Sequence, residues 1–171
     1  MISKDTRVEI LPVLAIEQMA LGADPLPNLP FAIISIMTSP TQAVSLPKSD
    51  RLLGTLRLNF PDFEKPVKGW EKAELFSPKM ANQVWDFIET VPAPEILLIH
   101  CEAGISRSAA VGAAIAKVIG QDFDAYFEKY YPNPLVYRVM LEEWNRRNNV
   151  SEPVVVPPKT FPEGLSAKDI F

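Results

Sequence analysis

Residues 95–119 read EILLIHCEAGISRSAAVGAAIAKVI, and this stretch joins a strand pattern to a helix pattern. Glu95–His100 is an apolar run of strand length that leads directly into Cys101. Arg107–Ile119 is rich in alanine and carries larger apolar residues at helical spacing, which is typical of a helix in close contact with its surroundings. Gly120 suits the C-terminal cap of that helix. The stretch therefore predicts a buried strand, a short loop and a helix.

Three further strands are predicted before this stretch. Phe31–Met37 is apolar throughout, as expected for a strand that is covered on both faces. The other two are Val8–Ala15 and Gly54–Phe60, and proline-rich connections separate the strands. We expect an α/β fold with a single domain, built on a twisted, mostly parallel sheet with helices on both faces.

Three further helices are predicted to pack on this sheet. One begins at Pro78 after the N-cap residue Ser77, and its apolar side chains repeat at helical spacing. Two more are indicated by apolar side chains between residues 123 and 144. Asn133 and Pro134 suit the N-cap and the first turn of the second of these.

The chain has 171 residues, 47% of which are hydrophobic, so it is long enough to bury the core of one domain. We expect that domain to span residues 1–150. Residues 151–171 contain four prolines and no helical period. They are expected to form an extended tail.

One cysteine and one histidine exclude an internal disulfide and a zinc cluster of Cys and His ligands. The 17 Lys and Arg residues against 21 Asp and Glu residues leave a net charge of -4, without the basic excess that nucleic-acid binding usually requires. No apolar run approaches the roughly 20 residues of a membrane span. An unpaired thiol suits a reducing compartment. We expect a cytoplasmic monomer that binds no metal, cofactor, nucleic acid or membrane.

The loop between the predicted strand and helix has the residues of an anion site. Arg107 follows Cys101 after six residues, and Gly104 between them lets the backbone turn without a side chain intruding. Backbone N–H groups in a tight loop and the N-terminus of the next helix attract a phosphate. We expect the loop backbone and the Arg107 guanidinium to bind it, the loop residues being Glu102, Ala103, Gly104, Ile105 and Ser106. In that field Cys101 is expected to be a thiolate nucleophile at neutral pH.

The sequence HCEAGISRS at residues 100–108 resembles the signature loop of the cysteine-based protein tyrosine phosphatases, and AGISRSAA looks like that of the dual-specificity branch. The resemblance implies the same α/β architecture and a phosphomonoester hydrolase in which Cys101 attacks phosphorus to form a phosphocysteine. It implies that Arg107 binds the phosphate and stabilises the transition state, and that Ser108 helps the thiolate to leave. The matching His100 would be structural, and Asn133 in Tyr131-Pro132-Asn133 matches a stretch that follows the signature in many dual-specificity members.

The leaving group of a phosphate ester needs a proton donor, which must be sought elsewhere in the chain. Phe60-Pro61-Asp62 looks like the family's Trp-Pro-Asp loop with the aromatic residue changed, which makes Asp62 the candidate general acid. Glu64 is the nearest competitor and Asp50 a weaker one. An ordinary turn carboxylate beside a proline is the alternative interpretation of Asp62.

The substrate is predicted to be a phosphorylated protein or a small phosphate ester. Inositol-lipid phosphatases of the superfamily that the loop resembles tend to carry lysines between the cysteine and the arginine. This loop has no lysine between Cys101 and Arg107, so the resemblance disfavours the highly phosphorylated headgroups of inositol lipids. Phosphotyrosine, phosphoserine and phosphothreonine all stay open.

Four other interpretations compete with hydrolysis of phosphate esters. A lone cysteine is commonly a small buried hydrophobic residue. A papain-like hydrolase is disfavoured because His100 directly precedes Cys101, and adjacent side chains of an extended segment point to opposite faces. A rhodanese-type sulfurtransferase is disfavoured by Ser108 and Asp62. The non-enzyme alternative is a pseudophosphatase that binds phosphoproteins without turnover.

Overall fold

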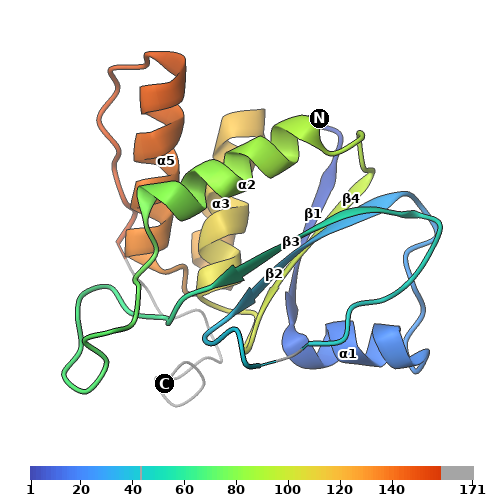
Figure 1. Ribbon diagram of the computed structural model, residues 1–171. Coiled ribbons are helices and arrows are strands. Elements are labelled where there is room, and N and C mark those ends of the chain that lie inside the picture. Colours follow the sequence, from blue (N-terminus) through green and yellow to red (C-terminus); the bar gives the residue numbers. More distant parts are fainter. Residues whose placement is uncertain (43, 159–171) are drawn as a thin grey trace.

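Figure 1 shows the computed structural model of the chain, which describes residues 1–42 and 44–158. Four strands and five helices occur in these residues. The strands are β1 (Arg7–Pro12), β2 (Phe31–Met37), β3 (Leu52–Asn59) and β4 (Ile96–Cys101). The helices are α1 (Val13–Leu21), α2 (Pro78–Thr90), α3 (Arg107–Ile119), α4 (Asp124–Lys129) and α5 (Pro134–Asn148).

The strands form one parallel sheet in the order β1-β4-β2-β3. Strand β4 lies between β1 and β2, and its last residues pair with the ends of both neighbours. Pro12 lies opposite Cys101, and Ser35 lies opposite His100. The expected α/β fold with a parallel sheet is confirmed, and the carboxyl ends of all four strands meet at one edge, where ligands bind in open sheets of this kind.

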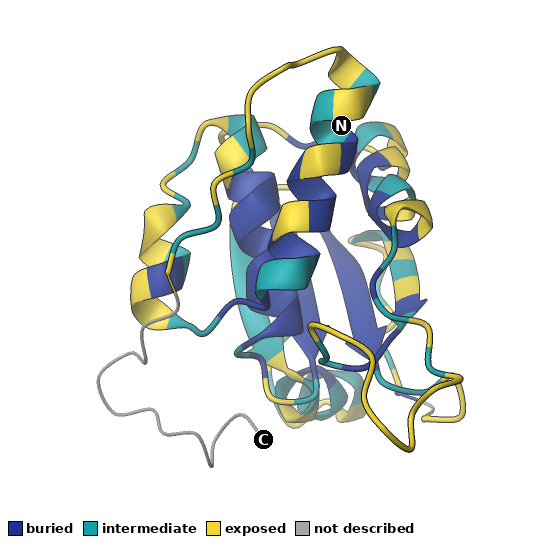
Figure 2. Ribbon diagram, turned by 90° about the vertical axis from the view of Figure 1, so that its left-hand side faces the viewer, coloured by how far each residue is buried: buried dark blue, intermediate teal, exposed yellow. Residues whose placement is uncertain are grey.

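Helices cover both faces of the sheet, as predicted (Figures 1 and 2). One face packs under α1 around the fully buried Ile16. The other face packs under the remaining helices, and α3 lies buried along most of its length. At Gly112 in α3 an added Cβ would lie 2.7 Å from Ile10 of β1 and 2.9 Å from Tyr126 of α4. The glycine therefore allows α3 to approach β1 and α4 closely.

The predicted bounds of several elements are accurate. Helix α3 spans Arg107–Ile119 as expected, and Gly120 caps it at φ 78°. Helix α2 begins at Pro78 after Ser77. Asn133 caps α5, because its side-chain oxygen accepts the Val136 N–H at 3.1 Å.

The first strand is shorter than predicted. It ends at Pro12, and Val13–Leu21 forms helix α1 instead of a continuation of the strand to Ala15. The Val13 N–H donates to the Glu102 carbonyl, so the chain leaves the sheet where the loop after β4 begins. The apolar residues of α1 cover the second face of the sheet, and a continuous apolar run does not distinguish such a helix from a strand.

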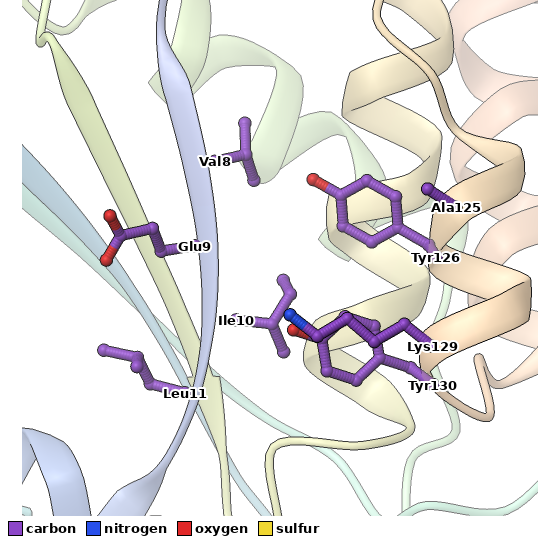
Figure 3. Close-up of a pocket in the computed structure, with 8 residues that line it drawn as sticks. All are labelled: Val8, Glu9, Ile10, Leu11, Ala125, Tyr126, Lys129 and Tyr130. Carbon is purple, nitrogen blue, oxygen red and sulfur yellow. The ribbon is translucent and has the colours of Figure 1, made fainter. Parts of the chain in front are cut away.

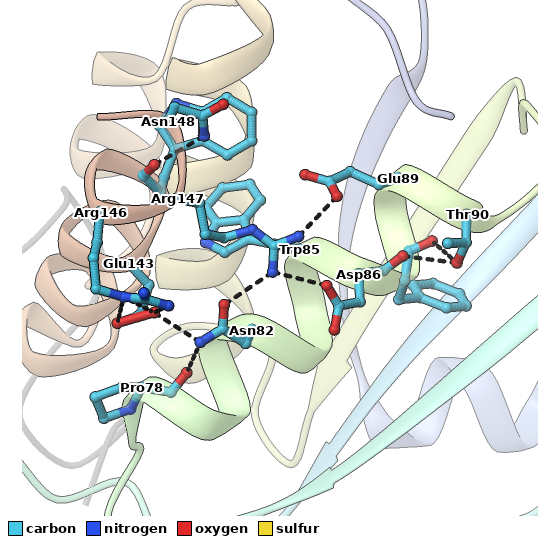
Figure 4. A network of polar contacts seen from close by, with 12 residues as sticks. Pro78, Asn82, Trp85, Asp86, Glu89, Thr90, Glu143, Arg146, Arg147 and Asn148 are labelled. Atoms are coloured by element: carbon cyan, nitrogen blue, oxygen red, sulfur yellow. Dashed lines mark hydrogen bonds and ion pairs between the residues drawn. The ribbon is translucent and has the colours of Figure 1, made fainter. Parts of the chain in front are cut away.

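Polar contacts join α2 to α5 on the outer side of the helical layer (Figure 4). Arg147 pairs with Asp86 at 2.7 Å and with Glu89 at 2.8 Å. Asn82 donates to Glu143 at 2.7 Å, and Arg147 donates to the Asn82 side-chain oxygen at 2.9 Å. These polar contacts, together with the apolar contacts beneath them, hold α2 and α5 against each other.

Residues 151–158 form no helix or strand, but they still contact the domain. Val154 and Val156 pack against the core, and Asn145 donates to the Glu152 carbonyl at 2.8 Å. Residues 159–171 of the predicted tail lie outside the described residues, so the boundary at residue 150 stays a prediction. Within the described part of the chain, no helix has both the length and the apolar character needed to cross a membrane.

Candidate active site

A pocket of about 300 Å³ opens at the carboxyl edge of the sheet. The loop after β4 forms its base, and the segment after β3 forms one wall. The predicted residues that line it are Asp62, Cys101, Glu102, Ala103, Ile105, Ser106 and Arg107. The candidate nucleophile, the candidate acid and the candidate phosphate-binding arginine therefore share one cavity, although Asp62 is 39 residues before Cys101 in the sequence.

Cys101 is the last residue of β4 and only 2% exposed. Its Sγ lies 3.1 Å from the Ser108 Oγ in the first turn of α3. The Gly104 N–H donates to the same sulfur at 3.3 Å. Two hydrogen-bonding groups thus face the sulfur, one from the loop and one from the helix.

Gly104 gives the loop its close approach to β1. Its φ is +70°, and an added Cβ would lie 2.5 Å from the Pro12 nitrogen and 2.6 Å from the Leu11 carbonyl carbon. The predicted need for a residue without a side chain is confirmed. The clash, however, is with the backbone of the neighbouring strand, not with the pocket.

Gly104→Ala should therefore destabilise the protein more than a glycine replacement that meets only backbone strain. Gly120 is the matched control, because its φ is +78° and an added Cβ would meet nothing within 4 Å. We expect Gly120→Ala to lower the free energy of unfolding by about 1–2 kcal/mol. Gly104→Ala should lower it by about 2 kcal/mol more, since rigid backbone must move. Urea unfolding of both variants measures the difference, and equal losses would contradict this account.

Arg107 begins α3, and its guanidinium is 4% exposed beneath the pocket. Its Nη1 donates to the Phe60 carbonyl at 2.9 Å and to the Thr38 Oγ1 at 3.1 Å. Its Nη2 pairs with the Glu102 carboxylate. The segments after β2, β3 and β4 all contact this one side chain, so its orientation is set before any ligand binds.

Asp62 lies in the wall that the segment after β3 forms. Its Oδ1 accepts the Ser106 hydroxyl at 2.9 Å and the Asn133 side-chain amide at 2.7 Å. Asn133 is 1% exposed and is itself held by the cap of α5. Both of the predicted residues Ser106 and Asn133 therefore orient the Asp62 carboxylate, a role that the sequence did not reveal.

The loop is also tied to the connection between α4 and α5. The Tyr131 N–H donates to the Ile105 carbonyl at 3.1 Å, and the Asn133 N–H donates to the Ser106 carbonyl at 3.3 Å. Two carbonyl oxygens of the loop are thus bonded to N–H groups of residues that do not line the pocket. A site for an anion needs N–H groups and not carbonyl oxygens on its surface.

His100 is fully buried, and its Nε2 lies 2.8 Å from the Ser35 Oγ on β2. Burial lowers the pKa of His100 to about 4. The ring is therefore neutral at pH 7. This position in the sheet is consistent with the structural role that the resemblance implies.

The two competing carboxylates lie elsewhere. Glu64 is exposed and does not line the cavity that holds Cys101. Asp50 is exposed and precedes β3, so it lies at the amino edge of the parallel sheet while Cys101 lies at the carboxyl edge. Asp62 is therefore the best placed of the three.

Apart from Pro61 of the Phe-Pro-Asp motif, three residues of the pocket were missed from the sequence: Thr38, Phe63 and Trp70. The rings of Phe63 and Trp70 meet edge to face with centroids 5.4 Å apart, and Trp70 is 49% exposed. A tryptophan within a stretch of charged residues was the one available sequence signal for this wall. Thr38 had no signal, because its contact with Glu102 follows from the pairing of β2 with β4.

A separate hollow of about 400 Å³ lies between β1 and α4 (Figure 3). Val8 and Ile10 face Tyr126 and Tyr130 there, and the Lys129 side chain lies beside Tyr130. Burial raises the pKa of Tyr126 to about 12. None of the predicted site residues lines this hollow.

The comparisons with known proteins concern the fold. No protein-family model and no curated protein matches the sequence. The structure is similar to the human tyrosine phosphatase-like serine/threonine/tyrosine-interacting protein, with a TM-score of 0.53 and 21% identity over 82% of this chain and 93% of that one. It is also similar to human DUSP28, with a TM-score of 0.50 and 14% identity over 87% of this chain and 99% of that one. The chain therefore has the single-domain fold of the cysteine-based tyrosine and dual-specificity phosphatases, as its loop sequence implied.

Proposed function

We propose that the chain is a protein-tyrosine or dual-specificity phosphatase that hydrolyses phosphate monoesters through a phosphocysteine on Cys101. One observation carries the proposal: the Cys101 thiol, the Arg107 guanidinium and the Asp62 carboxylate line a single pocket. The substrate would be a phosphorylated protein or a small phosphate ester, and the compartment the cytoplasm. Besides water, the proposed chemistry uses only groups of this chain.

In the first step the Cys101 thiolate attacks phosphorus, the S–P bond forms and the bond from phosphorus to the ester oxygen breaks. Asp62 gives its proton to that oxygen. The non-bridging oxygens are bound by Arg107 and the loop N–H groups, which stabilise the charge of the transition state. Both hydrogen bonds that Asp62 accepts from the described residues go to Oδ1, and Oδ2 would carry the proton.

In the second step a water molecule attacks the phosphocysteine. Asp62, now a carboxylate, accepts a proton from the water, and the S–P bond breaks. The sulfur leaves as a thiolate, and the Ser108 hydroxyl at 3.1 Å can donate to it. Inorganic phosphate is released, and the enzyme returns to its starting state.

The proton transfer makes Asp62→Asn selective among leaving groups. We expect kcat to fall about 100-fold or more for an alkyl phosphate, whose leaving group needs the proton, and far less for p-nitrophenyl phosphate. The asparagine oxygen can still accept from Ser106 and Asn133, so the loop should keep its position. Glu64→Gln and Asp50→Asn serve as controls. Equal slowing of both substrates would remove Asp62 as the general acid.

The experiment that tests the function is phosphate release from a panel of matched substrates. The panel contains peptides with phosphotyrosine, phosphoserine or phosphothreonine in one sequence context, a phosphoinositide and an aryl phosphate. We expect release from at least one phosphopeptide and little from the phosphoinositide. Thiosulfate is included because a sulfurtransferase would use it and a phosphatase would not.

Binding of phosphoproteins without turnover is the second candidate function. The burial of Cys101 at 2% exposure favours it, since a nucleophile must reach its substrate. The name of the human tyrosine phosphatase-like protein describes that relative in fold as an interacting protein. Phosphopeptide binding by the wild type with no release of phosphate from any member of the panel would establish this alternative.

A further inference from the structure

The side chain of Glu102 lies inside the pocket, where the loop was expected to contribute only backbone. Its Oε2 accepts the Thr38 hydroxyl at 3.1 Å, and its Oε1 accepts the Thr38 N–H at 3.2 Å. The same carboxylate pairs with Nη2 of Arg107. Thr38 in turn accepts a hydrogen bond from Arg107, so the three side chains form a closed set of contacts.

The charges of the pocket are not arranged for a phosphate alone. Among the described residues that line it, Arg107 is the single cationic side chain, while Asp62 and Glu102 are both carboxylates. A dianionic phosphoryl group must compete with Glu102 for the guanidinium. Like charges held this close oppose each other strongly when partly shielded from water.

The two members of the ion pair differ in their access to solvent. The Arg107 side chain is 4% exposed and cannot leave its place beneath the loop, whereas Glu102 is 33% exposed. We therefore expect a phosphoryl group that binds Arg107 to displace the Glu102 carboxylate towards the mouth of the pocket. The half-exposed ring of Trp70 also lines the pocket. A carboxylate and an aromatic face both attract cations.

We propose that the charge of Glu102 determines substrate specificity. In the empty loop the Glu102 carboxylate pairs with Arg107, and a bound phosphoryl group takes its place on the guanidinium. The displaced carboxylate then favours a substrate with a cationic group beside the phosphoryl group. The substrate class is thus a phosphorylated segment with a neighbouring lysine or arginine, and acidic neighbours are rejected. This inference rests on the phosphate site of the proposed function, but it does not require turnover.

Binding to the Cys101→Ser protein tests the inference without catalysis. The probes are two fluorescent phosphotyrosine peptides that differ only in the residue next to the phosphotyrosine, which is lysine in one and glutamate in the other. Fluorescence anisotropy at low ionic strength gives both dissociation constants. We expect the lysine peptide to bind about tenfold more tightly. Adding Glu102→Gln should bring the ratio of the two dissociation constants close to one. It should also tighten the binding of inorganic phosphate severalfold.

Glu95→Gln on the Cys101→Ser protein is the matched control. It removes the same charge from the opposite end of β4, at an exposed residue. The peptide ratio should stay at the value of the Cys101→Ser protein. Glu102→Ala gives a second variant, and thermal unfolding confirms that each variant is folded.

The outcomes separate this inference from the proposed function. A peptide ratio that Glu102→Gln and Glu102→Ala leave unchanged overturns the inference, and so does a failure of both peptides to bind. Absence of phosphate release by the wild type overturns the proposed hydrolysis but leaves the binding result intact.

Discussion

Cys101→Ser is expected to lower phosphate release from an aryl phosphate or a phosphotyrosine peptide by at least about 10⁴-fold, since the reaction loses its nucleophile. A serine hydroxyl stays protonated at neutral pH and needs a base. The one histidine of the chain, His100, does not supply this base, because its Nε2 lies 2.8 Å from the Ser35 Oγ on the neighbouring strand. The Ser108 hydroxyl and the Gly104 N–H can still bond to the new oxygen, so the loop should remain intact. Initial rates of phosphate release measure the effect.

The single cysteine provides an independent check of this prediction. Iodoacetate should alkylate the wild type once, as mass spectrometry would detect, and inactivate it in parallel. Inorganic phosphate should protect Cys101 from the reagent if it binds over the sulfur. The Cys101→Ser protein should not be labelled and should still bind phosphopeptides. Normal turnover by Cys101→Ser would disprove the phosphocysteine mechanism.

The strand, loop and helix at residues 95–119 could be predicted accurately because their determinants are local. The apolar run before Cys101, the glycine of the loop and the alanine-rich helix follow one another within 25 residues. The structure bears out the predicted bounds of α3 and the cap at Gly120. The residue type also indicated the local roles of Gly104 and Asn133. Glycine adopts a positive φ without strain, and asparagine is favoured at a helix N-cap.

Helix α1 could not be predicted from the same kind of pattern. Its apolar residues continue those of β1 without a break, and the change from strand to helix depends on the face of the sheet that α1 must cover. Pro12 ends β1 and is the N-cap residue of α1, and it pairs with Cys101 of the adjacent strand. The end of β1 can therefore be predicted only when the position of the adjacent strand is known.

The contacts inside the pocket depend on the order of the strands. Thr38 meets Glu102 because β2 lies beside β4, although 64 residues separate the two in the sequence. Asp62 could be proposed from the Phe-Pro-Asp motif. Its partners Ser106 and Asn133 come from two other parts of the chain and were not predictable as partners. Sequence motifs therefore pointed to the candidate reactive groups, and the fold supplied the groups that orient them.

Arg107→Lys should lower kcat/KM for a phosphate monoester by about 10³-fold while the protein stays folded. A lysine keeps the positive charge and can still pair with Glu102. Its single ammonium cannot donate in one plane to two phosphoryl oxygens, and it cannot also reproduce the bonds that Nη1 makes to Phe60 and Thr38. Steady-state kinetics with p-nitrophenyl phosphate, together with a thermal unfolding curve, measure both effects.

Arg147→Lys is the control that separates catalysis from stability. Arg147 also makes several bonds with its planar group, to Asp86, Glu89 and Asn82, but it joins α2 to α5 and does not line the pocket. Arg147→Lys should lower the thermal stability about as much as Arg107→Lys does, but it should keep the kcat/KM of the wild type. If both variants lost activity in proportion to their stability, Arg107 would be a structural residue only. A large loss in Arg107→Lys alone means that the geometry of the guanidinium, and not its charge, stabilises the transition state.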